Sequence, residues 1–415
     1  MDCYGVFMNS EYLFKVALGI ESPWEITDIK FDNLQTGKEL HINIDFKRGS
    51  RFSDDAGELC EVHDTVQKTW RHLNFFEHSC YLHCRVPRIK TTDGKVKLVE
   101  VPWSRAGSGF TLLFEAYVMA LIESEMPVNK IGHLINENAH RLWTIFNYWI
   151  SRAYDADQPK APKTLGLDET SKKKGHDYVT LAVDLDERRV LHVAEGKDRH
   201  AVKAVKTYLE SKGIDANKVR NASMDMSPSF ISGVSEYFPR AEIHFDRFHV
   251  VKLLNEAMDK VRQAERKEHD ELKGHKYTFL KNKNNLSYSK QRALSELITL
   301  YPTLGKAYRL KELFNDLWEM EDEEEATHFL VNWCKEVEQS NIPSFKQFVK
   351  MIKAHWTGIV NFCETEINNG VLEGINSKVQ LAKKRARGYR CTENFINMIY
   401  FLCGKLKFDY PLYSS

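Results

Sequence analysis

Long hydrophobic runs are missing from this sequence of 415 residues: no apolar stretch reaches the roughly 18 residues that a membrane-spanning helix needs. The N-terminus has no basic stretch followed by an apolar core, so we expect no secretory signal. Cysteine is sparse, with 8 residues scattered among many lysines and glutamates, which argues against a framework of disulfide bonds. We therefore expect a cytoplasmic protein with no membrane partner.

A strong net charge is also absent, because 59 lysines and arginines nearly balance 58 aspartates and glutamates. The charges are nevertheless segregated along the chain. Residues 319–326 contain six acids and no base, whereas residues 378–390 contain six basic residues and no acid. This segregation favours a protein with one face for a polyanion, although two separate solvated faces would give the same pattern.

The chain has enough apolar residues for more than one folded domain. Hydrophobic residues make up 42% and aromatic residues 12% of the sequence, which excludes global disorder. A chain of this length should form roughly two to four domains. Residues 155–163 are polar and contain two prolines, so we predict that they link an N-terminal half to a C-terminal half.

Residues 1–105 have the pattern of a small β-rich module. Residues 24–32 and 39–46 alternate apolar and polar side chains, as the strands of a half-buried sheet do. The Asp93-Gly94 pair between apolar runs is typical of a hairpin turn.

This module also contains side chains of the kinds that bind zinc. The candidate ligands are Cys60, His63, Cys80 and Cys84, with His83 as an alternative to Cys84. If residues 80–84 form a strand, Cys80 and Cys84 face the same side, as residues that merely pack in a core do. Zinc binding and core packing therefore remain alternative explanations.

Residues 106–154 have the layout of a helix-turn-helix. Residues 127–135 fit a short helix with proline in its first turn, and residues 139–150 fit a longer amphipathic helix after a tight turn. In such a motif the second helix enters the major groove of DNA, which makes His140, Arg141 and Thr144 candidates for DNA contacts. Helix pairs with similar turns also occur in many α-rich proteins.

The C-terminal half alternates strand and helix patterns in the order β-β-β-α-β-α-β-α, from residue 164 to about 254. This order is that of a ribonuclease H-like mixed sheet, and right-handed crossovers would bring its first and fourth strands side by side. Residues 255–363 show only helical patterns and interrupt the order, so we predict an all-helical insertion. The core would then resume over residues 364–405, before a tail at 406–415. We thus expect an α+β multidomain protein.

Three acids in this half fit a metal-dependent phosphoryl-transfer site. Asp168 and Asp225 each end an apolar strand, and Glu373 lies on a helix after the insertion. Moving a phosphodiester bond requires an activated oxygen nucleophile and a stabilised leaving oxygen, which two magnesium or manganese ions about 4 Å apart provide when carboxylates hold them. Asp246 ends the next strand, and His249 behind it could contact the phosphate or orient a carboxylate.

Each of these residues also has an ordinary structural explanation. Asp168 could cap a turn, Asp225 could be the N-cap of the next helix, and Glu373 could be a surface glutamate. His249 could cap the helix that it begins. The three acids in this order of elements are more specific than any one of them alone. We exclude Glu169, because neighbouring residues of a strand point to opposite faces.

Several blocks of the sequence resemble the signature blocks of bacterial insertion-sequence transposases of the ISL-three type. In the C-terminal half they are residues 165–170 (LGLDET), 223–227 (SMDMS), 246–252 (DRFHVVK) and 370–378 (GVLEGINSK). In the N-terminal half they are residues 63–65, 69–73, 81–83, 101–105 and 107–115. The resemblance covers roughly residues 58–405.

The resemblance implies a ribonuclease H-like core whose acidic triad is Asp168, Asp225 and Glu373, preceded by a DNA-binding helix-turn-helix. Asp246 and His249 are similar to an acid-or-cysteine-x2-His motif of related transposases with helical insertions. The family's N-terminal module usually carries paired zinc-ribbon cysteines, and this chain departs from that pattern because Cys60 has no CxxC partner. Zn²⁺ is therefore a doubtful cofactor here.

We expect a DNA transposase that recognises the terminal inverted repeats of its own element, cleaves a strand and joins the freed 3′ hydroxyl to target DNA. It would act on double-stranded DNA as a homodimer or higher oligomer, near the bacterial nucleoid. The basic residues that follow Glu373 would contact the DNA backbone: Lys378, Lys383, Lys384, Arg385 and Arg387. The alternatives are an inactive, transposase-derived DNA-binding regulator and a structure-selective nuclease without strand transfer.

Overall fold

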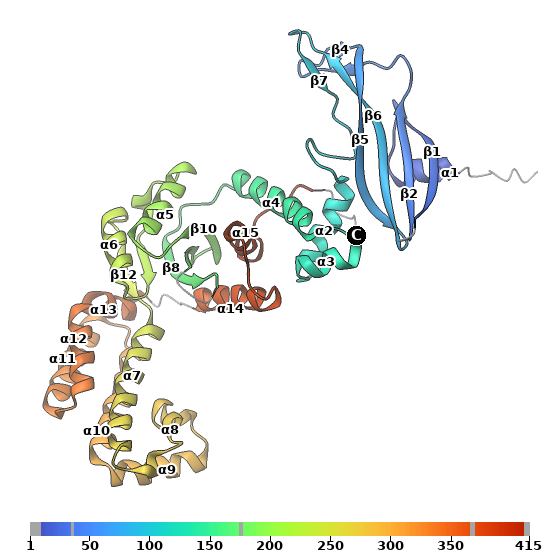
Figure 1. Cartoon of the computed structure of the whole chain (residues 1–415). Coiled ribbons are helices and arrows are strands. Elements are labelled where there is room, and N and C mark those ends of the chain that lie inside the picture. Colours follow the sequence, from blue (N-terminus) through green and yellow to red (C-terminus); the bar gives the residue numbers. More distant parts are fainter. Residues whose placement is uncertain (1–9, 35–36, 174–176, 366–369, 411–415) are drawn as a thin grey trace, which may run out of the picture. The chain divides into compact units, whose positions relative to one another are not determined.

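The computed structural model describes residues 10–34, 37–173, 177–365 and 370–410, and Figure 1 shows their secondary structure. The chain divides into two compact units, one formed by Met1–Ala156 with Leu406–Ser415 and the other by Asp157–Lys405. The division between Ala156 and Asp157 falls in the polar segment before the second sheet. No helix of the described chain is long and apolar enough to cross a membrane.

The first unit is built on a mixed sheet in which β1, β2, β6 and β5 lie side by side in that order. Strands β2 and β6 are parallel, and the other neighbours are antiparallel. The predicted hairpin at Asp93-Gly94 is confirmed, because β6 pairs with β7 across it. The elements of this part are α1 (Ser10–Ala17), β1 (Trp24–Leu34), β2 (Gly37–Phe46), β3 (Phe52–Ser53), β4 (Leu59–Cys60), β5 (Val62–Phe75), β6 (His78–Lys90) and β7 (Val96–Leu98).

Three helices follow this sheet: α2 (Leu112–Glu123), α3 (Val128–Ile135) and α4 (Ala139–Ala156). The backbone of Arg71 on β5 binds the chain just before α2, with the Arg71 N–H donating to Gly109 O and the Thr111 N–H donating to Arg71 O. The Arg71 side chain is 2% exposed and reaches the carbonyl of Ile135 at the end of α3, at 3.4 Å. The sheet therefore holds both ends of the α2–α3 segment.

The second unit contains a five-stranded mixed sheet in the order β10-β9-β8-β11-β12. Strands β8, β9 and β10 are antiparallel neighbours, as predicted, whereas β11 is parallel to both β8 and β12. Apolar residues fill these strands, and 0–1% of Leu165, Leu167 and Leu181 is exposed. The elements up to the last strand are β8 (Thr164–Ser171), β9 (Tyr178–Asp184), β10 (Arg189–Glu195), α5 (Arg199–Ser211), η1 (Ala216–Lys218), β11 (Asn221–Met224), α6 (Pro228–Tyr237) and β12 (Glu242–Phe245).

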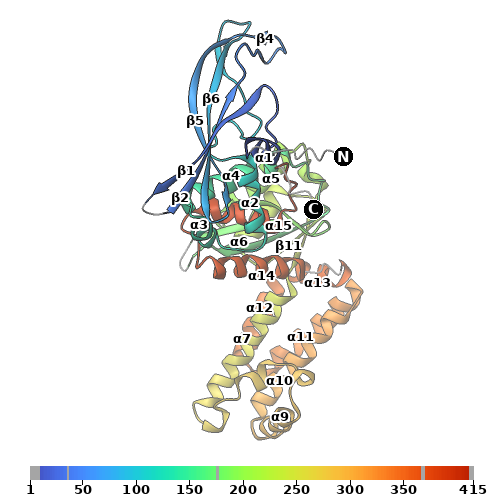
Figure 2. The same ribbon diagram turned by 90° about the vertical axis from the view of Figure 1, so that its right-hand side faces the viewer.

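Helices make up the rest of the second unit. Helix α7 (Arg247–Arg266) leaves the sheet and packs against α10 and α12 (Figure 2), while α13 packs on β12. Gly358 makes the latter contact possible, because a Cβ there would lie 2.5 Å from the Phe245 ring. The other elements are η2 (Asp270–Leu272), α8 (Lys276–Leu280), η3 (Lys283–Asn285), α9 (Tyr288–Leu300), α10 (Pro302–Phe314), η4 (Asn315–Glu319), α11 (Glu323–Ser340), α12 (Pro343–Ala354), α13 (Trp356–Thr365), α14 (Gly370–Arg385) and α15 (Thr392–Cys403).

Candidate active site and DNA-binding helices

Three aspartates come level with one another on neighbouring strands. Asp225 and Asp246 follow the last residues of β11 and β12, but the expectation that Asp168 ends its strand is wrong, because β8 continues to Ser171 and stays paired with β9. Strands β8 and β11 are parallel, and Gly166 is paired with Ser223. Two residues further along each strand, Asp168 comes level with Asp225. Asp246 follows β12 directly, as Asp225 follows β11, and the last residues of those two strands are paired. Because adjacent strands lie about 4.8 Å apart, the three acids form a row across the sheet.

A backbone amide holds one oxygen of each carboxylate in this row. The acceptor and donor pairs are Asp168 Oδ1 with the Glu169 N–H at 2.7 Å, Asp225 Oδ1 with the Ser227 N–H at 3.0 Å, and Asp246 Oδ1 with the Phe248 N–H at 2.9 Å. Asp246 is thereby also the N-cap of α7. The second oxygen of Asp225 has no hydrogen-bond partner within the described part of the chain. The row is therefore oriented by the backbone, and Asp225 keeps one oxygen available for a ligand.

His249 lies on the first turn of α7, beside this row. Its Nδ1 is 3.1 Å from Asp246 Oδ2. This hydrogen bond is the main cause that raises the pKa of His249; the charges of Asp246, Asp225 and Asp168 act in the same direction, and burial opposes them. The imidazole is therefore easier to protonate than that of a free histidine.

Asp168 is the acid that is most affected by its surroundings. Burial is the main cause that raises the pKa of its carboxyl, and the charge of Asp225 acts in the same direction. Hydrogen bonds from Glu169 and Asn376 and the charge of His249 act in the opposite direction. Two like charges in a partly buried place favour the binding of a cation between them.

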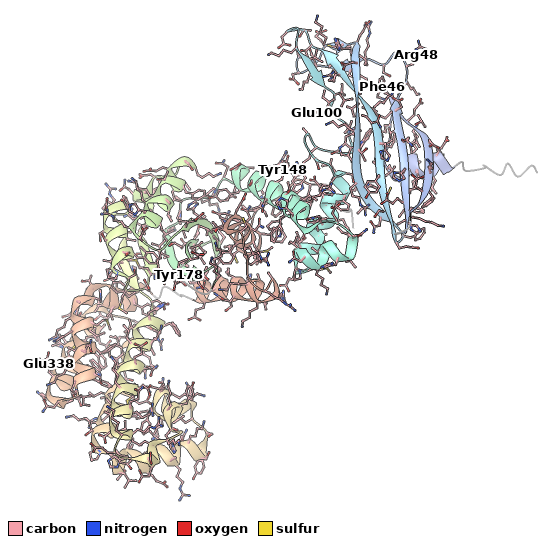
Figure 3. All side chains as sticks on the ribbon, viewed as in Figure 1. Phe46, Arg48, Glu100, Tyr148, Tyr178 and Glu338 are labelled. Atoms are coloured by element: carbon pink, nitrogen blue, oxygen red, sulfur yellow. The ribbon has the colours of Figure 1, made fainter. Side chains whose placement is uncertain are left out.

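Glu169 is affected by the same acids and also has a lysine close by. Its Oε1 is 3.8 Å from Lys197 Nζ, and the same ammonium group lies 4.2 Å from the ring centre of Tyr178, which Figure 3 labels. Burial is the main cause that raises the pKa of Glu169, and the charges of Asp225 and Asp168 act in the same direction; the charges of Lys197 and His249 lower it. Glu169 is therefore coupled by charge to the acids from which strand alternation separates it, and Lys197 is a further cation beside it.

Helix α14 lies along β8 and runs in the same direction. Three contacts in register define this packing: Leu372 Cδ2 lies 3.0 Å from the place of a Cβ on Gly166, the Asn376 amide donates to Asp168 Oδ2, and Gln380 Nε2 donates to Thr170 Oγ1 at 3.1 Å. Two strand residues advance about 6.7 Å and four helix residues about 6 Å, so the contacts stay in step. A Cβ on Gly166 would also lie 2.9 Å from Leu185 Cδ2, so a side chain there would require the Leu185 and Leu372 side chains to shift.

Glu373 lies one turn before Asn376 on α14, and its side chain is exposed. Three residues along a helix correspond to an offset of about 60° around its axis, so Glu373 borders the face that lies on β8. Among the described residues, no three acidic, histidine or cysteine side chains form a group that could hold a metal ion. The structure thus places Asp168, Asp225, Asp246 and His249 in one neighbourhood, with Glu373 at its border.

Asn376 lies on the helix predicted to carry Glu373, but the sequence gives it no role at the site. Its side-chain amide binds the carboxylate of Asp168, which lies 208 residues away in the chain. The only local signal is its position three residues after Glu373, on an adjacent part of the same helix surface.

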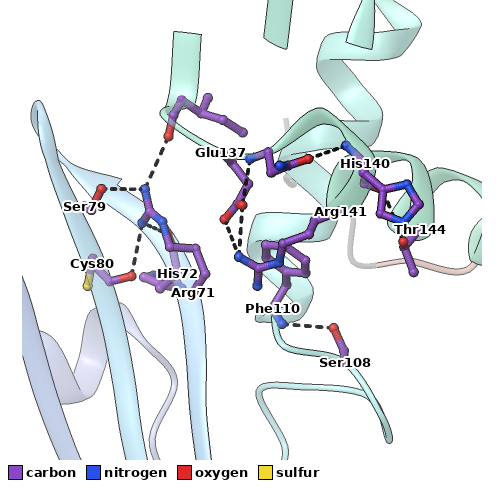
Figure 4. A network of polar contacts seen from close by, with 12 residues as sticks. Arg71, His72, Ser79, Cys80, Ser108, Phe110, Glu137, His140, Arg141 and Thr144 are labelled. Atoms are coloured by element: carbon purple, nitrogen blue, oxygen red, sulfur yellow. Dashed lines mark hydrogen bonds and ion pairs between the residues drawn. The ribbon is translucent and has the colours of Figure 1, made fainter. Parts of the chain in front are cut away.

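Helices α3 and α4 form the helix-turn-helix, and its turn depends on a glycine. A Cβ on Gly132 would lie 2.7 Å from the carbonyl oxygen of Glu137, so only glycine allows the turn to close so tightly. Asn136 ends α3 with φ 53°, in the left-handed region. The Asn138 side chain accepts a hydrogen bond from the His140 N–H at 2.8 Å and thereby caps α4 (Figure 4).

The three predicted DNA contacts lie on the exposed side of α4 (Figure 4). His140 and Thr144 are one turn apart, and the Thr144 hydroxyl donates to the His140 carbonyl at 3.2 Å. Arg141 is engaged within the protein, because its Nη1 lies 2.9 Å from Glu137 Oε1 and its guanidinium group lies 4.3 Å from the ring centre of Phe110. His140 and Thr144 are therefore more available for DNA than Arg141.

The basic residues after Glu373 are not equivalent. Lys378, Lys384, Arg385 and Arg387 are exposed. Lys383 instead donates to the carbonyl of Ser171 at 2.7 Å and helps to fix α14 on β8.

The candidate zinc ligands do not come together. Cys80 and Cys84 lie in the apolar core of the first sheet, and burial raises the pKa of both thiols to about 12. Cys60 lies on β4, and the His63 side chain on β5 is 51% exposed. The ring of His83 lies 2.9 Å from both Thr69 Oγ1 and His41 Nδ1. Core packing explains both buried cysteines, because a thiol that stays protonated is a poor metal ligand.

A helix-turn-helix followed by a mixed sheet that carries a row of aspartates defines a protein that binds DNA and acts on it. Comparisons with known proteins make this class specific. Residues 165–399 match the family model described as a transposase, and residues 99–150 match the helix-turn-helix domain of transposase family ISL3. The chain belongs to the ISL3 family of insertion-sequence transposases.

Curated relatives agree with this family along most of the chain. The chain is 27% identical to the transposase for insertion sequence element IS1001 of Bordetella parapertussis, over 86% of this chain and 90% of the relative. It is 24% identical to the transposase for insertion sequence element IS1557 of Mycobacterium tuberculosis, over 94% of both chains.

Proposed function

We propose that the protein cleaves DNA strands at the ends of its own insertion sequence and joins them to target DNA, in a reaction that depends on divalent metal ions. The observation that carries this proposal is the row formed by Asp168, Asp225 and Asp246 across adjacent strands. The strand order supports a ribonuclease H-like core over residues 164–254 and 364–405, interrupted by a helical insertion over 255–363.

The donor atoms around Asp168 fit a hard divalent cation. Carboxylate oxygens are the ligands that magnesium and manganese prefer, and Asp225 has one oxygen without a protein partner among the described residues. In this proposal Asp168, Asp225 and Glu373 hold two ions. When bound, the ions would activate the attacking oxygen and stabilise the leaving oxygen.

The chain's own residues then orient the site. Backbone amides fix Asp168 and Asp225. Asn376 of α14 binds Asp168, and Glu373 lies within one helical turn of Asn376. Rotation about the side-chain bonds of Glu373 would direct its carboxylate towards the aspartates. His249, held by Asp246, would hold a proton near the scissile phosphate.

DNA recognition falls to other surfaces in this proposal. The exposed His140 and Thr144 of α4 would read the terminal inverted repeats, with residues 106–154 as the DNA-binding domain. Lys378, Lys384, Arg385 and Arg387 would contact phosphates of the DNA, as a homodimer or higher oligomer brings two ends together. Contacts of this kind make binding depend steeply on salt concentration.

The direct test is a strand-cleavage assay on the element's end sequences, with magnesium or manganese as the added ion. Asp168→Asn, Asp225→Asn and Glu373→Gln should each abolish cleavage and retain binding to the ends. Asp316→Asn, at an exposed acid of the helical part, is the matched control and should cleave normally. Undiminished cleavage by Asp168→Asn would contradict the proposal.

A regulator without catalytic activity is the alternative to test, because Glu373 lies outside any three-residue ligand group among the described residues. A regulator would bind the ends and never nick them. Supplying a precleaved DNA end with a free 3′ hydroxyl distinguishes a transposase from a nuclease without strand transfer. The transposase would give a joined product, and the nuclease would give none.

A further inference from the structure

The amide of Asn376 holds the carboxylate oxygen of Asp168 that the backbone leaves unpaired. Oδ1 of Asp168 accepts from the Glu169 N–H, and Oδ2 accepts from Nδ2 of Asn376. Both oxygens of this acid therefore have a defined donor. Asp225 and Asp246 are held by other groups, namely the Ser227 and Phe248 amides and, for Asp246, the ring of His249.

The other half of the same amide lacks a partner. Oδ1 of Asn376 is buried and accepts no hydrogen bond from any described residue. A buried acceptor without a donor costs about 1–3 kcal/mol, so native proteins rarely leave one unpaired unless an ion or water completes it. Turning the amide around would not help, because its oxygen would then face a carboxylate oxygen.

Docking of α14 does not explain this residue. Leu372 packs at Gly166, Gln380 binds Thr170, and Lys383 binds the Ser171 carbonyl, so the helix has contacts with β8 on both sides of Asn376. Those three residues contact Gly166, the Thr170 hydroxyl and the Ser171 carbonyl. Asn376 instead contacts the carboxylate of Asp168, whose pKa is raised by burial. A purely structural role would make Asn376 equivalent to Gln380.

We propose that Asn376 is a positioning residue of the active site, which fixes the Asp168 carboxylate for a divalent cation and accepts a hydrogen bond from the water shell of that ion. The inference rests on the proposed function, because it concerns the same cation site. Hydrated magnesium keeps several of its waters in protein sites, and such a water supplies the donor that Oδ1 of Asn376 lacks.

The test measures Mn²⁺ binding to the full-length protein by electron paramagnetic resonance, without DNA and therefore without catalysis. Asn376→Ala should weaken Mn²⁺ binding about 10- to 100-fold, the range typical for residues that orient metal ligands. Gln380→Ala, one turn further on the same helix face, should bind Mn²⁺ like the wild type. If Asn376→Ala does not fold, Asn376→Leu provides the same measurement with a side chain of similar shape.

A second readout separates positioning from general damage. Raising the Mn²⁺ concentration should restore cleavage to Asn376→Ala and should not restore it to Asp168→Asn. Equal Mn²⁺ affinity in the wild type and Asn376→Ala, with loss only in Asp168→Asn, would overturn the role of Asn376 and leave the cation site intact. Equal affinity in all three proteins would overturn the cation site itself and the inference with it.

Discussion

The surroundings of Asp168 disfavour its ionised form in the protein without bound metal or DNA. Burial and the charge of Asp225 raise the pKa of its carboxyl. A raised pKa in the folded state means that the ionised acid destabilises the fold at every pH above the ordinary value near 3.8. Catalytic groups often carry such a cost, which binding of the cation would remove.

Asp168→Asn should therefore raise the unfolding temperature at pH 7 in the absence of divalent ions. The gain should shrink as the pH falls towards 4, because both folded and unfolded wild-type chains then become protonated. Added magnesium should stabilise the wild type and not the variant. Thermal unfolding at several pH values measures this, and a variant less stable than the wild type at pH 7 would contradict it.

At the scale of elements, two glycines leave room for close contacts near the functional helices. Gly166 leaves room for the side chains of Leu185 and Leu372, and Gly132 lets α3 and α4 meet at a tight turn. Neither requirement can be read from the sequence, since a glycine in a helix or strand pattern usually signals only weak propensity. The need for glycine can be recognised only when the residues that pack against these positions are known.

Gly132→Ala should open this turn, because its Cβ would lie 2.7 Å from the Glu137 carbonyl oxygen. We expect a loss of stability of about 1–3 kcal/mol, as overpacking typically costs, and weaker binding to the element's ends. Gly374→Ala is the control, since nothing lies within 4 Å of its Cβ and alanine favours a helix. Denaturant unfolding and DNA-binding titrations measure both effects; a Gly132→Ala protein with unchanged binding would contradict this account of the turn.

The sequence predicts the order of the strands and helices in the second unit, while the roles of the candidate site residues stay a prediction. Periodicity predicts the strand that carries Asp168 and the strand that Asp225 follows, and Asp246-x2-His249 is a local motif whose hydrogen bond the structure contains. The contact between Asn376 and Asp168 spans 208 residues and depends on how α14 lies on β8, which no local pattern encodes. Cys80 and Cys84 of the first sheet have a spacing that fits zinc ligands, but they are core residues. Spacing alone does not distinguish the two roles.

At the scale of the whole molecule, each unit contains a partly buried histidine that resists protonation. Burial lowers the pKa of His72 in the first unit and His192 in the second to about 4. For a histidine with a lowered folded pKa, the unfolded chain takes up a proton first as the pH falls. Stability should therefore be lost between pH 6.5 and about 4 in both units.

We expect this loss to reach about 1.4 kcal/mol per pH unit for each histidine within that window. His72→Gln should make the unfolding free energy of the first unit depend less on pH. His192→Gln should do the same for the second unit. His133→Gln, at an exposed position on α3, should change neither. Denaturant unfolding across this pH range is the measurement. Equal slopes of unfolding free energy against pH in the wild type, His72→Gln and His192→Gln would contradict the assignment.

The central claim is that Asp168, Asp225 and Glu373 share bound metal ions when the protein engages DNA. Iron-mediated cleavage of the polypeptide tests it most directly, because Fe²⁺ in a magnesium site generates hydroxyl radicals that cut the nearby backbone. The account predicts protein fragments ending near residues 168, 225 and 373, all suppressed by excess magnesium and by Asp168→Asn. Cuts near 168 and 225 with none near 373 would contradict it.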